Sequence, residues 1–288
     1  MRYLVLDIGG SSIKYALMDE EAQIYEHSSI PTPMDTLENF IETIGQIYDQ
    51  YKEIIEGIAI SMPGILNPQT GYCYTGGALL YIHDINIVEA LQKRCRCPIT
   101  IGNDAKCAAQ AELGFGNLKG IDDGVVILLG TGIGGCLIKD GRVHYGKHFF
   151  GGEFSFVSTD SEKLWCQENG IDGLLICVQK RLETTDIYNG VEIFEMAKQG
   201  NIKVQEGIKD FVRILVRQIY NLQAIFDPEK FVIGGGISAQ SLLFEYIEEI
   251  SQEMFKSRFN VVKPWVEPCL YHNHSNLIGA LYQFLNCH

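Results

Sequence analysis

The clearest shortage in this 288-residue sequence is of positive charge. It holds 23 Lys and Arg residues against 36 Asp and Glu residues, which gives a formal net charge of −13 at pH 7. A nucleic-acid-binding protein needs a basic face to meet the phosphates. The charge therefore argues against a nucleic acid as the partner.

Two further absences narrow the class of protein. No apolar run approaches the roughly 20 residues that span a bilayer, and the start MRYLVLDIGG does not fit a signal peptide. The nine cysteines are scattered, and only Cys95 and Cys97 form a close pair, as a lone C-x-C. Reduced thiols explain them better than a disulfide framework does. We therefore expect a cytoplasmic protein with no membrane partner.

Hydrophobic residues are plentiful, at 46%, beside 20% charged residues, as is typical of a globular protein. At this length two domains are a reasonable expectation. Apolar periodicity and turn residues predict strands at residues 3–8, 13–18, 23–27, 57–62, 99–101 and 231–233, and helices at residues 36–55, 86–94, 205–226, 238–256 and 277–285.

One order of elements occurs twice. YLVLDIGGSSIKYALMDEEAQIYEH, from Tyr3, reads as strand, glycine turn, strand, turn and strand, and GVVILLGTGIGGCLIKDGRVHYG, from Gly124, has the same order. The repeat favours two similar α/β halves that face each other across a cleft, with a hinge between them. A chance likeness between two antiparallel three-stranded segments is the alternative.

Each copy places glycines between its first two strands, in DIGGSS (residues 7–12) and LGTGIGG (residues 129–135). Glycine permits positive φ and close approach of a ligand, and converging N–H groups favour a phosphate. Neither turn is a P-loop, and a strand rather than a helix follows each one, so neither is a Rossmann fingerprint. An ordinary hairpin is the alternative. The equivalent positions of the turns, with a third glycine run at GGGIS (residues 234–238), favour phosphate binding.

Asp7 ends the first expected strand, immediately before the first glycine turn. Burying a carboxylate is unfavourable unless it is paired or binds a cation. Holding Mg²⁺ through water, beside phosphate oxygens, would offset that cost. The alternative is an Asp that bonds the backbone of its own turn.

The segment ITIGNDAKCAAQAE (residues 99–112) runs from a strand into an alanine-rich helix. Asn and Asp are both preferred N-caps, so a cap is one interpretation of Asp104. Two adjacent capping residues exceed what one helix end needs, however, and they follow a strand at the sheet edge where α/β proteins bind ligands. The other interpretation makes Asp104 the base that accepts a hydroxyl proton in phosphoryl transfer, with Asn103 orienting a polyol.

In the same order, these segments resemble the motifs of the ROK family, within the actin/hexokinase-like superfamily, from residue 3 to about residue 280. DIGGSSIK and LLGTGIGGCLI resemble its two phosphate motifs, MPGILNPQTG its PG-containing loop and GNDAKCAAQAE its catalytic segment. GGE (residues 151–153) resembles its sugar-contact segment, and FDPEKFVIGGGIS its adenosine-side motif.

The resemblance implies an α/β fold of two actin-like (ribonuclease H-like) domains, with mixed sheets flanked by helices and an interdomain cleft. Residues 1–115 with 276–288 would form the sugar-side domain, and residues 116–275 the ATP-side domain. It implies a kinase that uses ATP and Mg²⁺ to phosphorylate a sugar hydroxyl, and a homodimer. Family members that regulate transcription carry an extra N-terminal DNA-binding module, so with a first strand at Tyr3 we do not expect that role.

The resemblance also assigns roles to residues. Asp104 would be the general base, and Asn103, Glu153, Gly77 and Ala78 would contact the sugar. The residues that would bind ATP phosphates are Asp7 (through Mg²⁺), Gly9, Gly10, Ser11, Ser12, Lys14, Gly130, Thr131, Gly132, Gly134, Gly235 and Gly236.

The chain departs from the family in the zinc and sugar segment. The family usually follows its G-E with G-H and later has C-x-C-G-x-x-G-C-x-E, whereas this chain has GGEFSF and LWCQENGIDGLLI. Phe156 stands at the histidine position. Asn169 and Leu174 stand at cysteine positions, and Ile176 stands at the glutamate position. Because Cys166 alone cannot supply the four ligands of a zinc ion, we expect no structural zinc.

These replacements bear on the substrate. Phe156 and Ile176 would make the anomeric end of the site more apolar, which suggests a β-glucoside or disaccharide phosphorylated at the 6-hydroxyl. Phe154 and Phe156 could stack on a sugar ring, but we interpret both as core strand residues. His144, His148, His272 and His274 are expected to be loop or surface residues rather than metal ligands.

Two other functions remain open. A kinase-like sugar sensor without catalysis is consistent with the altered zinc and sugar segment. A filament-forming actin relative is a further alternative, although the sugar motifs would then have no purpose.

Overall fold

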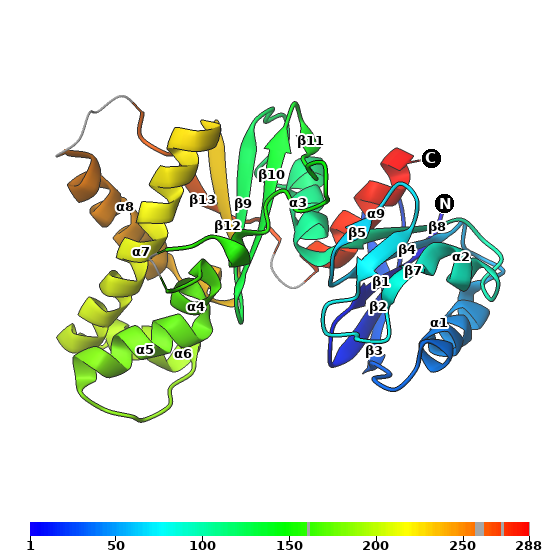
Figure 1. Ribbon diagram of the computed structural model, residues 1–288, viewed down its shortest axis with the longest axis horizontal. Helices are drawn as coiled ribbons and strands as arrows, with labels where there is room; N and C mark the ends of the chain where they lie inside the picture. The colour runs from blue at the N-terminus through cyan, green and yellow to red at the C-terminus, as the bar shows by residue number, and fades with distance from the viewer. Residues whose placement is uncertain (160–161, 257–261, 272–273, 288) are drawn as a thin grey trace. The chain divides into compact units, whose positions relative to one another are not determined.

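The computed structural model describes residues 1–288 except 160–161, 257–261, 272–273 and 288. The chain forms two compact units (Figure 1). Unit 1 comprises Met1–Phe115, Tyr145–Phe150 and Asn273–His288, and unit 2 comprises Gly116–His144 and Gly151–His272. The short segment Tyr145–Phe150 thus lies with unit 1, although the chain on both sides of it belongs to unit 2.

Unit 1 is built on a mixed five-stranded sheet of order β3-β2-β1-β4-β8. Its strands are β1 (Tyr3–Ile8), β2 (Ser12–Met18), β3 (Ile24–Pro31), β4 (Ile58–Met62) and β8 (Ile99–Asn103). A small sheet holds β5 (Leu66–Asn67), β6 (Tyr72–Thr75) and β7 (His83–Asn86). The helices are α1 (Leu37–Tyr51), α2 (Ile87–Gln92), α3 (Asp104–Phe115) and α9 (Ser275–Cys287).

Different helices cover the two faces of this sheet. Leu4 and Leu6 of β1 join Phe40 of α1 in the buried core, because alternate residues of a strand point to opposite faces. Tyr3 and Asp7 point the other way. They contact Phe284 and Asn276 of α9 respectively, and α9 also packs along α3. The last helix of the chain therefore completes unit 1.

Unit 2 repeats this plan. Its sheet has the order β11-β10-β9-β12-β13, with strands β9 (Gly124–Leu129), β10 (Ile133–Lys139), β11 (Arg142–Val143), β12 (Lys230–Gly235) and β13 (Val266–Pro268). Its helices are α4 (Trp165–Asn169), α5 (Ile171–Leu182), α6 (Gly190–Lys198), α7 (Ile202–Phe226) and α8 (Ser241–Lys256), with 3₁₀ turns η1 (Phe154–Phe156) and η2 (Gly236–Ala239).

The repeat predicted from the sequence is confirmed. In both sheets the first two strands are antiparallel, and the strand on the other side of the first is parallel to it. The expected α/β class, with mixed sheets flanked by helices, is confirmed as well. Among the described residues, no helix is long and apolar enough to cross a bilayer.

Several predicted boundaries were wrong by a few residues, for identifiable reasons. The long helix α7 begins at Ile202 rather than residue 205, because the Asn201 side chain accepts the N–H of Val204 and caps it. The strand predicted at residues 99–101 continues to Asn103, since it pairs with β4 over its whole length. The small sheet of β5, β6 and β7 was not predicted, because its strands of two to four residues give too little periodicity.

Candidate functional site

Asp7 is half-buried on the α9 side of the sheet, within a row of polar residues. Strand pairing aligns Lys14, Asp7 and Ser61 on neighbouring strands, at the edge where β1 enters its glycine turn. The Oδ1 atom of Asp7 accepts hydrogen bonds from Ser61 Oγ (3.1 Å) and from Asn276 Nδ2 (3.0 Å). These partners lie on β4 and α9, so the alternative of an Asp that bonds its own turn is wrong.

The donor set around Asp7 fits a cation held through water. Both of its hydrogen-bond donors are neutral and bind Oδ1, and within the described residues no side chain or backbone group donates to Oδ2. An acceptor-only carboxylate oxygen at the start of a phosphate-type turn is the ligand chemistry that Mg²⁺ prefers. Asp7 could therefore hold Mg²⁺ through Oδ2.

The first glycine turn is compact and fixed from outside. Gly9 N–H donates to the Ser12 carbonyl (2.9 Å), Thr32 Oγ1 donates to the Gly9 carbonyl (2.7 Å), and Thr32 N–H donates to the Ser11 carbonyl (3.2 Å). Gly10 and Ser11, at the tip, are exposed. The turn thus presents backbone groups to solvent on a rigid base.

The second turn has the same form in unit 2. Gly130 N–H donates to the Gly132 carbonyl (3.0 Å), and Ile171 N–H at the start of α5 donates to the Gly130 carbonyl (3.0 Å). A Cβ on Gly170 would lie 2.3 Å from the Thr131 carbonyl oxygen, so the helix start packs directly on the turn. Gly134 follows in β10, paired with Leu128 of β9.

The third glycine run lies beside this second turn. Gly235 of β12 pairs with Leu129, the residue before Gly130, and a Cβ at position 235 would lie 2.1 Å from the Leu129 carbonyl oxygen. Gly236 then opens η2. Two of the predicted phosphate-binding segments are therefore adjacent within unit 2.

One reason offered for the glycines was wrong at the two turns. Positive φ does not occur at Gly9 or Gly10, nor in the Gly130–Gly135 segment, whereas Gly235 does have a φ of +94°. Close packing explains some of these glycines instead. A Cβ on Gly10 would lie 3.2 Å from Ala78 Cβ, and a Cβ on Gly135 would lie 2.1 Å from the Phe154 ring.

Close backbone packing also brings the predicted sugar loops together in unit 1. Gly64 has a φ of +111°, and a Cβ there would lie 1.9 Å from the Thr75 carbonyl oxygen. Gly77 has a φ of +61°, and its Cβ would lie 3.0 Å from Pro63. Since Ala78 in turn contacts Gly10, the PG loop, the Gly77–Ala78 loop and the first phosphate turn form one continuous surface.

The structure separates the roles of Asn103 and Asp104. Asn103 Oδ1 accepts the N–H of Lys106 (3.2 Å), which is the N-cap bond of α3, and Asn103 Nδ2 donates to the Gly64 carbonyl (3.0 Å). Asp104 is the first residue of α3, half-buried, with Oδ1 accepting the N–H of Ala105 (2.8 Å). Asn103 therefore caps the helix and ties it to the PG loop, and the cap does not require Asp104.

Lys14 is exposed on β2, in the same register row as Asp7. It lines a pocket of unit 1 together with Ser29, His27 and His274. The lining also includes Tyr15 and Leu277 and is mostly apolar, so this pocket gives no separate support to a phosphate at Lys14.

Glu153 immediately precedes η1 in unit 2. Phe154 is 4% exposed and packs on Trp165, as predicted for a core residue, whereas Phe156 is 58% exposed. The core interpretation was therefore wrong for Phe156. Residues two apart share a face in a strand but not in a 3₁₀ turn, and this segment is a 3₁₀ turn.

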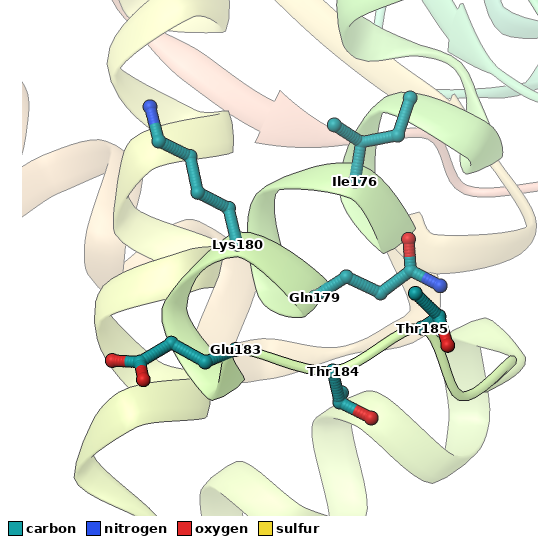
Figure 2. A pocket seen from close by; sticks show the side chains of 6 residues that line it. All are labelled: Ile176, Gln179, Lys180, Glu183, Thr184 and Thr185. Atoms are coloured by element: carbon teal, nitrogen blue, oxygen red, sulfur yellow. The ribbon is translucent and has the colours of Figure 1, made fainter.

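Ile176 lies on α5 and is 58% exposed. Figure 2 shows it with Gln179 and Lys180 on α5, lining a shallow, open pocket whose other lining residues are Glu183, Thr184 and Thr185.

Asn169, at one predicted zinc-cysteine position, is fully buried and bridges two helices. Its Oδ1 accepts the indole N–H of Trp165 (2.7 Å), and its Nδ2 donates to the Phe211 carbonyl on α7 (2.9 Å). A hydrogen-bonded amide thus joins α4 to α7. No cluster of three metal-ligating side chains occurs among the residues that the structure describes.

The histidines are on the surface where they are described. His144, His148 and His274 are exposed, as predicted, and His272 lies outside the described residues. Asn276, which fixes Asp7, was missed from the sequence because it is 269 residues away in the chain.

The sequence was also compared with known protein families and with curated proteins. A model of the ROK family matches residues 3–286. The chain is 28% identical to a beta-glucoside kinase of Listeria monocytogenes, covering 99% of this chain and 98% of that one. It is also 28% identical to an N-acetylmannosamine kinase of Vibrio cholerae, covering 99% of each chain.

Solved structures include two close matches. A ROK family protein from Streptococcus pneumoniae in complex with sucrose superposes with a TM-score of 0.89 at 32% identity, covering 99% of this chain and 98% of that one. A ROK family glucokinase from Streptomyces griseus, in complex with glucose and AMPPNP, superposes with a TM-score of 0.81 at 24% identity, covering 98% of each chain.

Proposed function

The chain belongs to the ROK family, and we propose that it is a sugar kinase that uses ATP and Mg²⁺ to phosphorylate the 6-hydroxyl of a hexose, a β-glucoside or a disaccharide. The observation that carries this proposal is that Asn103 and Asp104 have different roles at the start of α3. Asn103 makes the cap bond, so the Asp104 carboxylate is not required there. The relatives named as sugar kinases support the same class of reaction.

In the proposed reaction Asp104 accepts the proton of the sugar hydroxyl. The hydroxyl oxygen then forms a bond to the γ-phosphorus of ATP, the bond from that phosphorus to the β–γ bridging oxygen breaks, and ADP leaves. A positioned carboxylate base of this kind contributes about 10²–10⁴-fold in rate. Asn103 retains one N–H and one oxygen lone pair beyond its two hydrogen bonds, which it can offer to the sugar.

The phosphate-binding residues would stabilise the charge on the transferring group. Backbone N–H groups at the tips of the turns, at Gly10, Ser11 and Thr131, suit phosphate oxygens because these residues are exposed. Mg²⁺, when bound, neutralises charge on those oxygens, and Asp7 would hold it through water. Glu153, Gly77 and Ala78 would contact the sugar.

The choice of a glycoside rests on two supports. Phe156 and Ile176 stand where the family resemblance places a histidine and a glutamate, and neither side chain can hydrogen-bond to a free anomeric hydroxyl. Relatives at 26–28% identity include beta-glucoside kinases, and a structural neighbour binds sucrose. The N-acetylmannosamine kinases among the relatives make an amino sugar the main competing substrate.

A panel of sugars tests this proposal. ADP release would be measured with glucose, N-acetylglucosamine, N-acetylmannosamine, cellobiose, sucrose and an aryl β-glucoside, and the phosphorylated carbon would be identified by NMR. We expect at least one glycoside to match or exceed the free sugars. If glucose or N-acetylmannosamine exceeds every glycoside by a wide margin, the glycoside part of the proposal is wrong.

A sugar sensor without turnover is the second candidate, favoured by the same two replacements at Phe156 and Ile176. Sugar binding by calorimetry without ADP release from any member of the panel would select it. Two finer expectations accompany the kinase: a homodimer, which light scattering would detect as twice the 32.3 kDa of one chain, and a cytoplasmic location, which fractionation of the native cells would test.

A further inference from the structure

Four aromatic rings from two distant segments meet on unit 1. Tyr74 of β6 stacks on Phe149, with ring centroids 5.9 Å apart and an interplanar angle of 27°. Tyr72 lies edge-on to Tyr74 at 5.1 Å, and Tyr145 lies edge-on to Phe149 at 6.4 Å. The rings form a continuous row, which we call the aromatic ladder (Tyr72, Tyr74, Tyr145 and Phe149).

The aromatic ladder is not part of the hydrophobic core. None of its four members is in the buried cluster of unit 1, and Tyr74 is 40% exposed. Aromatic side chains contribute most to stability when they are buried, because their apolar area is large. A row of partly exposed rings therefore leaves apolar faces that a ligand could cover.

The Tyr145–Phe150 segment supplies two of the four rings. Phe149 has a φ of +56°, a conformation that is rare for a bulky residue. The segment belongs to unit 1, although its neighbours in the chain belong to unit 2. Its contacts with β6, through Phe149 and Tyr74, help to account for that position.

The ladder adjoins the proposed sugar loops. Tyr74 is three residues from Gly77, so the two Cα atoms lie within about 10 Å of each other. The next residue, Thr75, packs against Gly64. The carbonyl of Gly64 accepts a hydrogen bond from the Asn103 side chain. The aromatic ladder therefore lies next to Gly77 and near Asn103, two of the residues proposed to bind the phosphorylated sugar.

We propose that the aromatic ladder is a subsite for the second ring of a glycoside substrate, with the exposed ring of Tyr74 covering the C–H face of that ring and Phe149 supporting Tyr74 by stacking on it. This inference rests on the proposed function and narrows its substrate to glycosides whose second ring is a sugar or an arene. Rings suit this occupant because a pyranose has an apolar face, and the tyrosine hydroxyls can bond to its rim.

Discrimination between a glycoside and the free sugar tests the subsite. The ratio of kcat/KM for cellobiose, or for the best glycoside of the panel, to kcat/KM for glucose would be measured in Tyr74→Ala, Phe149→Ala and Tyr74→Phe. A stacking contact with a ring is worth up to about 1.5 kcal/mol, which corresponds to about tenfold in affinity. We therefore expect the ratio to fall about tenfold in each alanine variant, through a higher KM for the glycoside. Tyr74→Phe keeps the ring and loses only the hydroxyl, so it should retain most of the ratio.

Tyr25→Ala is the matched control, because Tyr25 is 46% exposed in the same unit but lies on β3, beside Asp19 and Arg2. It should leave the ratio unchanged. An unchanged ratio in both ladder alanine variants, with circular dichroism equal to wild type, would overturn the subsite while leaving the kinase intact.

Two other results are distinguishable. A wild-type enzyme that releases ADP with free sugars alone would also overturn the subsite. If no sugar releases ADP, the kinase proposal fails, and calorimetry with cellobiose then decides the subsite by itself. A tenfold weaker Kd in Tyr74→Ala than in Tyr25→Ala would support it, and equal Kd values, or no binding to wild type, would overturn it.

Discussion

Replacing Asn103 by alanine should destabilise unit 1 more than any conservative change at Asp104. The substitution removes the N-cap bond to Lys106 N–H, which is typically worth about 1 kcal/mol. It also removes the bond from Nδ2 to the Gly64 carbonyl, worth about another 1 kcal/mol. We therefore expect a loss of about 2 kcal/mol in the free energy of unfolding.

Two companion variants separate the contributions. Asn103→Asp keeps an oxygen that can cap α3 but loses the donor to Gly64, so we expect a loss of about 1 kcal/mol. Asp104→Asn removes a charge from the first turn of the helix, where the macrodipole interaction is worth about 0.3–1 kcal/mol. Its cost should be less than half that of Asn103→Ala.

Urea denaturation followed by circular dichroism measures these differences, with the urea dependence of the free energy held equal among variants. The ranking is the test. If Asp104→Asn destabilises the protein as much as Asn103→Ala does, Asp104 is a structural residue and the assignment of the cap to Asn103 is wrong.

Three further predictions concern stability. Gly279→Ala should cost about 3 kcal/mol by urea denaturation, because the new Cβ would lie 1.6 Å from the Cys107 carbonyl oxygen where α9 crosses α3, and no loss would contradict that close approach. Asn169→Ala should cost about 3 kcal/mol, because it leaves the Trp165 indole N–H and the Phe211 carbonyl unpaired. A chelator should not destabilise the wild type. A stable Asn169→Ala variant together with a wild type that the chelator destabilises would instead indicate a structural metal. The Arg181 guanidinium lowers the pKa of Asp210, so this pair stabilises the fold above the unfolded pKa of about 3.9 and the contribution is lost as pH falls through the lowered folded value. Asp210→Asn should therefore cost about 1 kcal/mol at pH 7 and progressively less below about pH 3.9, and a difference that does not depend on pH would contradict the ion pair.

The repeated architecture could be predicted because the sequence of each half contains the same pattern of apolar strands and glycine turns. Strands β1 and β9 are both mostly apolar, and a glycine turn follows each one. The hydrophobic pattern and the turn residues therefore predict the same elements in both halves. The functional candidates Asp7 and Asp104 were identified for the same reason, since Asp7 lies near the end of β1 and Asp104 directly follows β8.

What the sequence could not show are contacts between distant segments. The partner of Asp7 on α9 and the Gly64 carbonyl that binds Asn103 are brought close only by the tertiary fold. The reason for Gly10 was missed likewise, because its neighbour Ala78 lies in another loop. The ladder ring Phe149 belongs to a segment with no regular secondary structure, so periodicity gave no signal for it.

Phe156 shows how a wrong local assignment propagates. Treating GGEFSF as a strand placed Phe154 and Phe156 on one face, and the 3₁₀ turn places them on different ones. Apolar content alone was therefore a poor guide to which aromatic residues of this chain are available to a sugar.

The most direct test of the account is sugar-dependent ADP release by Asp104→Asn, measured with the best substrate of the panel at saturating ATP. The account predicts that kcat falls at least ~10²-fold while the variant remains folded and binds the sugar, because asparagine cannot accept the hydroxyl proton. Turnover equal to that of the wild type would contradict it and leave Asp104 as the first residue of a helix and nothing more.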